Sequence, residues 1–234
     1  GSFFSPATNR RSDSYGGDLR KRARFAIEVL EAIRAKIGDD VAIEYRISAD
    51  ELVPGAPSVE ETIEFATMIE DRIDLLHVSA GNLYVQETSP KMIQPIYVPR
   101  GINVDYAARF KQALRIPVAA VGSLTMDMAE EIIAENKADM VAMIRSIIAD
   151  PDCVKKAREG RADDIRPCVR CNRCLSDTRE YTRPTRCSVN PIAGREVEFL
   201  SPPAPAAKRK VVVIGGGPGG MEAARTAAER GHDV

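Results

Sequence analysis

Two stretches decide the fold, Ile116-Pro117-Val118-Ala119-Ala120-Val121-Gly122-Ser123 and Ala138-Asp139-Met140-Val141-Ala142-Met143-Ile144-Arg145. Each is a short apolar run, typical of a buried strand, that ends in small or polar residues. The segment between them begins with Thr125, a good helix N-cap, and has the pattern of an amphipathic helix to about Asn136. A strand, a helix and a second strand in this order predict a βαβ unit with parallel strands.

The same alternation precedes this unit along the chain. Further strands are expected over 41–47 and 73–78, and helices over 19–37, 58–71, 103–114 and from Arg145 to Gly160. Ser58 and Glu61 form a capping box at the start of the second helix. The chain is therefore predicted to be an α/β protein with a parallel sheet, as either a (β/α) barrel or a doubly wound sheet.

Polar residues and glycines gather where the expected strands end, and this favours the barrel. They are Arg46, Ser79, Gly122, Ser123 and Arg145. In a (β/α)8 barrel the carboxyl ends of the strands form the active site, and the last two loops commonly hold a phosphate. Gly122, Ser123 and Arg145 suit that role.

Four cysteines form a motif nearer the C-terminus: Cys168, Cys171 and Cys174 in one C-x-x-C-x-x-C run, followed by Cys187. Thiolates at this spacing suit an iron–sulfur cluster, because one short loop can wrap a cubane. A zinc knuckle, or free or disulfide-bonded thiols, are the alternatives on spacing. The fifth cysteine, Cys153, is expected in a helix and outside the motif.

The second motif is a glycine-rich turn, Gly215-Gly216-Gly217-Pro218-Gly219-Gly220. It follows the apolar run 211–214 and precedes a helical segment over 221–230, as a dinucleotide fingerprint requires. Gly215 would make the tight turn, Gly217 would admit a pyrophosphate, and Gly220 would allow close helix–strand packing. The acidic ribose-binding residue expected about 20 residues later is not in the sequence, so we expect a truncated domain.

Composition restricts the class of protein. The 234 residues carry a net charge of −1, which argues against a nucleic-acid partner, and no apolar run approaches membrane-spanning length. The sparse cysteines favour a reducing compartment, hence a cytoplasmic location.

With these residues collected, the chain resembles the Old Yellow Enzyme family, in the iron–sulfur branch that includes 2,4-dienoyl-CoA reductase, 2-enoate reductase and trimethylamine dehydrogenase. The segments that carry the resemblance are 4–17, 45–48, 77–81, 121–123, 139–151, the four-cysteine motif, 188–191 and the glycine turn. Barrel strands one to four of that family have no counterpart here.

The resemblance implies a division of the chain into three parts. Residues 1–160 would be the C-terminal half of an FMN-binding (β/α)8 TIM barrel, 161–207 a 4Fe-4S segment and linker, and 208–234 the start of a Rossmann-like domain for FAD or NAD(P)H. Half a barrel would leave an open sheet, so we expect the fragment alone to be a poor catalyst. Its partner would be the missing barrel half or a second copy of the chain.

Residue roles also follow from the resemblance. Arg46 would lie at the pyrimidine end of FMN, and Gly122, Ser123 and Arg145 would bind its phosphate. Ile144 replaces the small residue usual before that arginine. Tyr84 would contact substrate or donate a proton, with Ser79 or Asn82 as alternatives. The remaining assignments are four cluster ligands, Cys168, Cys171, Cys174 and Cys187, and three dinucleotide-binding glycines, Gly215, Gly217 and Gly220.

The resulting hypothesis is an oxidoreductase that uses NAD(P)H to reduce the C=C bond of a small α,β-unsaturated enoate or dienoyl substrate. Electrons would pass from FAD through the 4Fe-4S cluster to FMN. The alternatives are an amine dehydrogenase of the trimethylamine dehydrogenase type, a non-catalytic electron-transfer module, and a zinc-stabilised binding module.

Overall fold

The computed structural model describes residues 1–199, 205 and 207–234, and the chain divides into two compact units, 1–193 and 194–234. The expected cluster segment 161–207 spans both units, and its residues 200–204 and 206 lie outside the described part. No helix in the described ranges is both long and apolar enough to cross a membrane.

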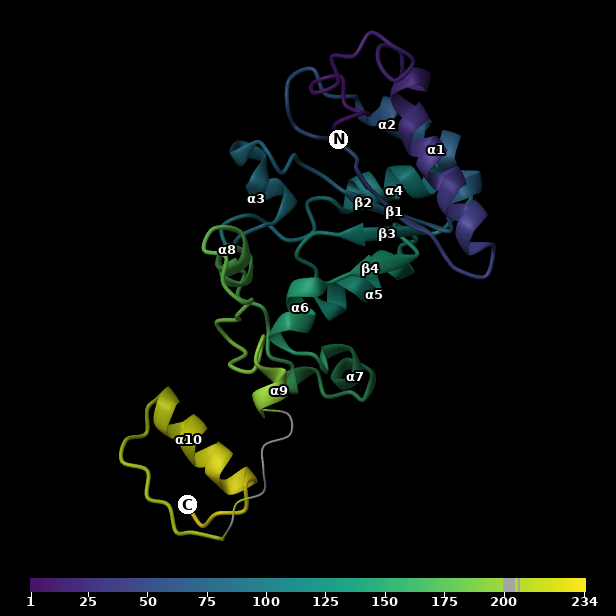
Figure 1. Ribbon diagram of the computed structural model, residues 1–234. Helices are drawn as coiled ribbons and strands as arrows, with labels where there is room; N and C mark the ends of the chain where they lie inside the picture. The colour runs from purple at the N-terminus through teal and green to yellow at the C-terminus, as the bar shows by residue number, and fades with distance from the viewer. Residues whose placement is uncertain (200–204, 206) are drawn as a thin grey trace. The chain divides into compact units, whose positions relative to one another are not determined.

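Four parallel strands form the sheet of the first unit (Figure 1). They are β1 (Glu44–Ser48), β2 (Leu75–Ser79), β3 (Val118–Val121) and β4 (Met140–Ala142), in the spatial order β1-β2-β3-β4. Arg46 pairs with His77, His77 with Ala119, and Ala119 with Met140, so one register runs across the sheet. A sequential order of parallel strands is the winding of a barrel, whereas a doubly wound sheet reverses its order.

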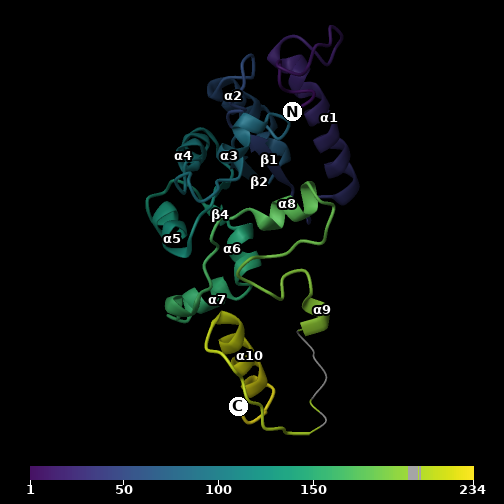
Figure 2. The ribbon, with the colours of Figure 1, turned by 90° about the vertical axis from the view of Figure 1, so that its left-hand side faces the viewer.

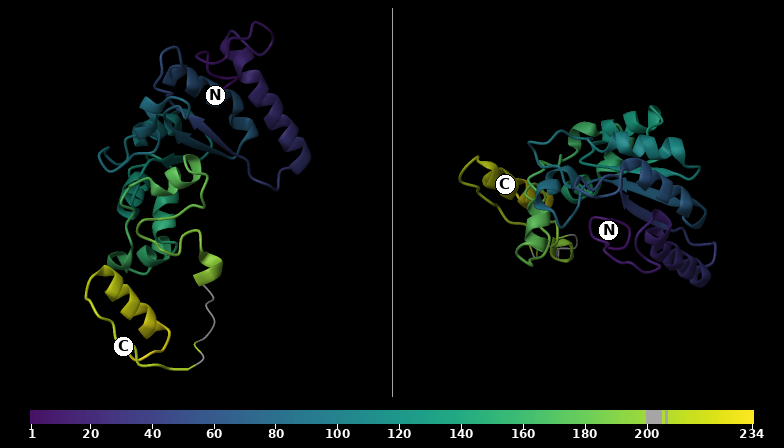
Figure 3. Two further views of the ribbon diagram at one scale, coloured as in Figure 1. Left: turned by 60° about the vertical axis from the view of Figure 1, so that its left-hand side comes forward. Right: turned by 90° about the horizontal axis from the view of Figure 1, so that it is seen from above.

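Helices cover one face of this sheet. The long helices are α1 (Leu19–Ile37), α2 (Val59–Ile69), α4 (Val104–Ala113) and α5 (Met126–Ala134). Leu76, Val78 and Val118 point into a common core with residues of these helices, and α1 and α2 lie side by side in both views of Figure 3. Alternate residues such as Arg46 and His77 point to the opposite face, because side chains alternate along a strand.

Several expected boundaries are confirmed. The helix over 19–37 is α1, and the Ser58 side chain accepts a hydrogen bond from the Glu61 N–H, as a capping box requires. The loop between β2 and α4 contains the 3-10 helix Gln86–Thr88 and α3 (Ser89–Met92).

The expected strand 138–144 is too long. It ends at Ala142, and α6 (Ile144–Ala149) begins at once, so Arg145 lies in the first turn of a helix rather than at a strand end. The helix expected from Arg145 to Gly160 is broken into α6 and α7 (Cys153–Arg158). The backbone of Asp150 is extended there. Asp150 precedes Pro151, and the proline ring disfavours the helical conformation in the residue before it.

The remaining elements are short. A 3-10 helix, Ala162–Asp164, and α8 (Arg173–Arg179) complete the first unit, and α6 and α8 lie near each other in Figures 1 and 2.

The second unit contains α9 (Glu196–Phe199) and α10 (Pro218–Glu229). The expected strand 211–214 is not formed, and only Lys210 makes an isolated parallel bridge, with Asp233. A single extended segment has no neighbouring strand to complete a ladder within this unit.

Phe65 on α2 is the centre of aromatic packing in the core. It is 1% exposed, and its ring lies 4.4 Å from Phe4 and 5.9 Å from Tyr45, centroid to centroid. We expect Phe65→Ala to lower the free energy of unfolding by about 3–5 kcal/mol, since it leaves a cavity under the sheet. Urea unfolding would measure this. Phe25→Ala, at a 42% exposed position, should cost clearly less; equal losses would contradict this account of the core.

Asp150 ties the α6–α7 junction to the segment before the thiols. Its carboxylate accepts from Lys156 Nζ at 2.6 Å and from the Arg166 N–H at 2.9 Å. Burial raises the pKa of this carboxyl, but Lys156 and the N–H groups of Arg166 and Asp152 outweigh it and hold the pKa below its ordinary value.

A lowered pKa means that the folded state favours the ionised carboxylate. Its contribution to stability is therefore present above the unfolded pKa of about 4 and is lost as the pH falls through the lower folded value. Asp150→Asn should cost about 1–3 kcal/mol at pH 7, and much less near pH 2–3. Unfolding curves at both pH values check this, with exposed Asp39→Asn as the control. A loss that is the same at both pH values would show that ionisation is not the cause.

Candidate functional site

A pocket of about 410 Å³ lies at the carboxyl ends of β2, β3 and β4. Its walls come from the strand ends, the loop 92–100, the start of α6, and the segment that carries the thiols. The polar residues and thiols among its lining are Arg46, His77, Gln94, Arg100, Ser123, Arg145, Ser146, Cys168, Cys174, Thr178 and Thr185. We call it the strand-end pocket.

The turn after β3 has a backbone that few residues adopt. Gly122 has φ +144° and Ser123 has φ +59°, so both lie in the left-handed half of conformational space. Gly122 has no Cβ and tolerates this conformation, which turns the chain sharply away from the strand. The turn places Ser123 on the wall of the pocket.

Three guanidinium groups line the strand-end pocket. Arg46 Nη2 lies 3.4 Å from Ser79 Oγ, Arg145 Nη1 donates to the Gln94 carbonyl at 2.9 Å, and Arg100 Nη1 donates to the Ser123 carbonyl at 3.0 Å. Within the described ranges, none of the three forms an ion pair with a carboxylate. Burial lowers the pKa of Arg145 and of Arg100. Arg100 and Arg145 are half-buried and Arg46 is exposed. Cations that line a pocket without carboxylate partners indicate a site for an anion.

Two buried polar atoms in the pocket wall lack hydrogen-bond partners. They are Nε2 of His77 and Oε1 of Gln94, and they are the only side-chain atoms of this kind among the described residues. Glu44 Oε1 holds the other ring nitrogen of His77, Nδ1, at 2.7 Å. An unsatisfied buried polar atom costs about 1–3 kcal/mol, so a polar ligand or a water in the pocket would stabilise both.

The four thiols line a second, smaller pocket, and Arg145, Cys168 and Cys174 line both pockets. Burial raises the pKa of Cys174, as do the charges of Cys168 and Cys187, and Arg145 opposes this. Burial also raises the pKa of Cys171, but bonds from the Ser188 hydroxyl and the Arg173 N–H leave it below its ordinary value. In the described parts of the chain, no three His, Cys, Asp or Glu side chains converge as a site for one metal ion.

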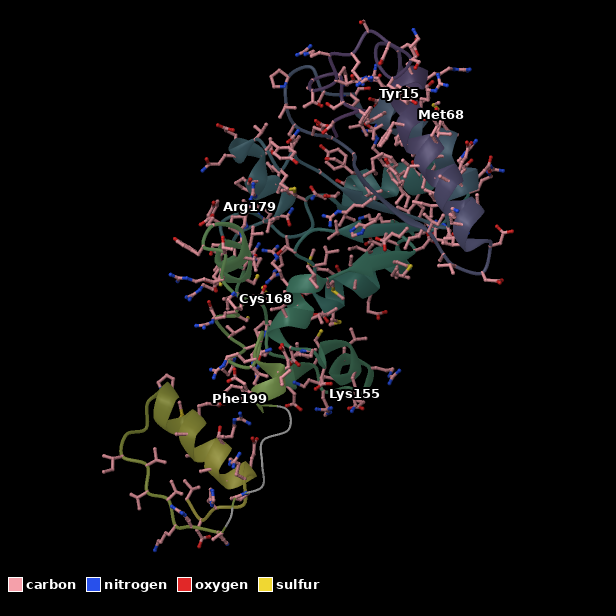
Figure 4. All side chains as sticks on the ribbon, viewed as in Figure 1. Tyr15, Met68, Lys155, Cys168, Arg179 and Phe199 are labelled. Atoms are coloured by element: carbon pink, nitrogen blue, oxygen red, sulfur yellow. The ribbon has the colours of Figure 1, made fainter. Side chains whose placement is uncertain are left out.

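Residues 168–174, here called the thiol loop, turn tightly. Arg170 and Asn172 have φ +55° and +57°, so left-handed residues alternate with the cysteines. The loop is fixed to residues 93–98 by side chains that donate to backbone carbonyls: Arg170 to Val98 and Ile96, and Asn172 to Ile93. Figure 4 shows Cys168 beside α6, and Arg179 at the end of α8.

The structure brings five of the predicted cofactor residues together. Arg46, Gly122, Ser123, Ile144 and Arg145 all line the strand-end pocket, although Arg145 reaches it from α6.

Tyr84 does not line this pocket. It lies in the turn after β2 with 89% of its surface exposed, and its N–H donates to Asn82 Oδ1.

The glycine turn lies in the second unit. A Cβ added at Gly220 would meet the Gly215 carbonyl oxygen at 1.9 Å, so this position admits only glycine. Gly217 is the N-cap of α10, and Gly215 has φ +115°. The start of α10 therefore packs closely against the residues before the turn, as the spacing predicts, although these residues form no strand.

Sequence reasoning missed several residues of the two pockets: His77 and Gln94 with their unpartnered atoms, and Arg100 and Asn172, which join the loops. His77 alternates with Leu76 and Val78 on its strand, so its inward orientation could have been recognised. Arg100 and Gln94 belong to a proline-containing loop without periodicity, and no pattern marks them.

Comparison with known proteins identifies a family that matches this chain. Residues 1–164 match the model of the NADH:flavin oxidoreductase / NADH oxidase family. An NADH oxidase from Thermoanaerobacter brockii is 45% identical over 237 residues, which cover 100% of this chain and 36% of that protein.

Two solved structures are also similar over nearly the whole chain. One is a 2-naphthoyl-CoA reductase in complex with 2-naphthoyl-CoA, with a TM-score of 0.89, 38% identity, and coverage of 100% of this chain and 36% of that one. The other is a histamine dehydrogenase from Rhizobium sp. 4-9, with a TM-score of 0.86, 34% identity, and coverage of 99% and 34%.

The chain thus spans about a third of the length of these relatives. The resemblance to the Old Yellow Enzyme family and its amine-dehydrogenase relatives is confirmed, as are the α/β fold and the parallel sheet. The chain belongs to the NADH:flavin oxidoreductase / NADH oxidase family.

Proposed function

We propose that the chain is part of an NAD(P)H-dependent oxidoreductase, located in the cytoplasm, that reduces the C=C bond of a small α,β-unsaturated substrate. In this proposal residues 1–160 are the C-terminal half of an FMN-binding barrel, 161–207 hold a 4Fe-4S cluster, and 208–234 begin a domain for FAD or NAD(P)H. The observation that carries it is the strand-end pocket, where three arginines without carboxylate partners face one cavity.

The residues present fit FMN. Its phosphate would find Arg145 and Ser123 at the turn after β3, and Arg46 would face the other end of the flavin from β1. The unpartnered atoms His77 Nε2 and Gln94 Oε1 offer further polar contacts in the same wall. Membership of the flavin oxidoreductase family supports this choice of anion.

The four thiols fit a group larger than a single ion. A tetrahedral zinc with bonds of about 2.3 Å would draw its thiolates to within about 4 Å of one another. The thiols here share a pocket without converging so closely. A 4Fe-4S cluster held by Cys168, Cys171, Cys174 and Cys187 suits that arrangement.

Each side chain has a defined task in this proposal. FMN, when bound, supplies hydride transfer to the substrate, and the cluster supplies single electrons. Arg46 places a cation where negative charge grows on the reduced ring, and it is oriented by Ser79. Arg145 holds the phosphate end and, through Asn172, the thiol loop. Ile144 begins α6 next to it and adds an apolar side chain to the lining of the pocket.

The open face of the sheet supports the barrel assignment. Glu44, Arg46 and Met140 point away from the helices and are exposed, whereas parallel sheets are normally covered on both faces. Four further strands, from the same polypeptide or from a second copy, would close the barrel and shield this face. Tyr84 stays a proposed substrate contact, and its exposure means that a closing segment would have to cover it.

Gly215, Gly217 and Gly220 are proposed to bind the pyrophosphate of FAD or NAD(P)H. The steric requirement for glycine at Gly220 and the start of α10 at Pro218 support this role, since the helix N-terminus would face the anion.

An amine dehydrogenase is the second candidate, and the similarity to histamine dehydrogenase favours it. The two functions differ in the direction of electron flow. Anaerobic bleaching of the flavin absorbance by NAD(P)H, with none by small amines, would support the reductase. Bleaching by amines alone would support the dehydrogenase.

The cysteine assignment predicts the metal content of variants. Protein purified without oxygen should contain iron with matching acid-labile sulfide and little zinc. Cys174→Ser should lose most of both, because its thiol lies among the other three. Cys153→Ser is the matched control, since Cys153 is buried in α7 away from this pocket, and it should keep the wild-type content. Zinc without sulfide would refute the cluster.

The phosphate assignment predicts the effect of removing a charge. Arg145→Gln should weaken FMN binding by about 10- to 100-fold, because a hydrogen bond to a charged group contributes about 1.5–3 kcal/mol. Fluorescence titration of deflavinated protein with FMN measures the Kd. Arg158→Gln removes an exposed arginine of α7 and should leave the Kd unchanged. An unaltered Kd for Arg145→Gln would show that the phosphate binds elsewhere.

A further inference from the structure

We propose that Arg100 is a positioning residue that couples the strand-end pocket to the thiol loop. This inference rests on the proposed function, because the two pockets are taken to hold FMN and an iron–sulfur cluster. It adds a connection between them that neither motif contains, since Arg100 belongs to the irregular loop between β2 and α4.

One guanidinium group makes both contacts. Arg100 Nη1 donates to the Ser123 carbonyl at 3.0 Å and lies 3.4 Å from Ser123 Oγ, while Nη2 donates to the Cys168 carbonyl at 3.3 Å. Ser123 belongs to the turn after β3, and Cys168 begins the thiol loop. In the described ranges, Arg100 is the residue whose side chain hydrogen-bonds both Ser123 and one of the four cysteines.

The neighbouring arginines bridge differently. Arg170 connects the thiol loop to the carbonyls of Ile96 and Val98 and, in the described part of the chain, forms no hydrogen bond with Ser123. Arg145, from α6, donates to Asn172 Oδ1 in the thiol loop and to the Gln94 carbonyl in the loop 92–100, so it joins the same two loops as Arg170. Of these three arginines, Arg100 is the one that joins the turn after β3 to the thiol loop.

The charges around Arg100 explain why this connection would respond to ligands. Arg145 and Arg170 are close enough to repel it, and a thiolate at Cys168 would attract it. Three guanidinium groups this near one another need anions for balance. A phosphate beside Ser123 and thiolates in the thiol loop would both supply negative charge, one at each end of the same side chain.

Such a shared cation has two consequences. A positive charge beside Cys168 stabilises the more negative, reduced state of the group that the thiolates hold, and thereby raises its reduction potential. A ligand that draws Arg100 toward Ser123 also changes the field at Cys168. Filling one site therefore alters the other, and by linkage the effect is reciprocal.

The test uses the holoprotein, with variants Arg100→Gln and Arg100→Lys. Arg109→Gln is the matched control, because Arg109 is an arginine of α4 that pairs with Glu60 far from either pocket. The Kd for FMN is measured by fluorescence titration of deflavinated protein. The midpoint potential of the iron–sulfur signal is measured by redox titration with electron paramagnetic resonance, with FMN and without it.

For Arg100→Gln we expect about a tenfold weaker FMN Kd, a more negative midpoint potential, and loss of the shift in potential that FMN causes in the wild type. Arg100→Lys keeps the charge but not the fork that reaches both carbonyls. Its midpoint potential should therefore stay close to the wild-type value, while the FMN-induced shift in that potential is lost. This variant decides the case if Arg100→Gln does not fold. Arg109→Gln should behave as the wild type.

A wild-type Kd, potential and FMN-induced shift in both Arg100 variants would overturn the inference. A shift that survives in Arg100→Lys would also overturn it, since the coupling would then need only a charge and not the bridge. Failure of the proposed function has a different signature, because the wild type itself would then lack flavin or iron with sulfide.

Discussion

The alternation of side chains along four parallel strands determines what the rest of the structure can do. Leu76 and Val78 face the helices, and His77 and Ser79 face away, with the same division on the neighbouring strands. The helices thus cover one face. The other face is polar on β1 and β2, with Arg46, His77 and Ser79, and apolar on β3 and β4, with Ala119 and Met140. Since all four strands run in one direction, the polar residues and the turns after the strands meet at a single edge.

This edge gathers three arginines that form no ion pair with a carboxylate of residues 1–199, 205 or 207–234. Arg46 comes from β1, Arg145 from the first turn of α6, and Arg100 from a loop, yet all three line one pocket. Clustered cations cost stability unless anions or carbonyl groups compensate them. The surroundings provide backbone carbonyls as hydrogen-bond acceptors, such as those of Gln94, Ser123 and Cys168.

Prediction from the sequence succeeded where a residue is tied to a regular element. Gly122 and Ser123 follow a strand directly, and Arg46 lies within one, so periodicity alone places them at the edge of the sheet. Arg145 lies in the first turn of α6 and not at the predicted strand end, because an apolar run does not reveal where a strand becomes a helix. Arg100 and Gln94 could not be identified from the sequence, because hydrogen bonds between loops produce no periodic pattern of residues. The run 211–214 has the composition of a strand, but a strand needs neighbours that residues 207–234 do not supply.

The thiol loop, mostly without regular structure, is held in place by side-chain hydrogen bonds. Arg170 and Asn172 are left-handed, so residues 168–172 form no helix or strand before α8 begins at Arg173. Arg170, Asn172 and Arg100 instead provide the bonds between this loop and its surroundings. The loop 93–98 has no ladder of its own, and its carbonyls accept most of these bonds. The thiol loop and the loop 93–98 therefore restrain each other. A ligand that fixed either loop would lower the entropic cost of ordering both.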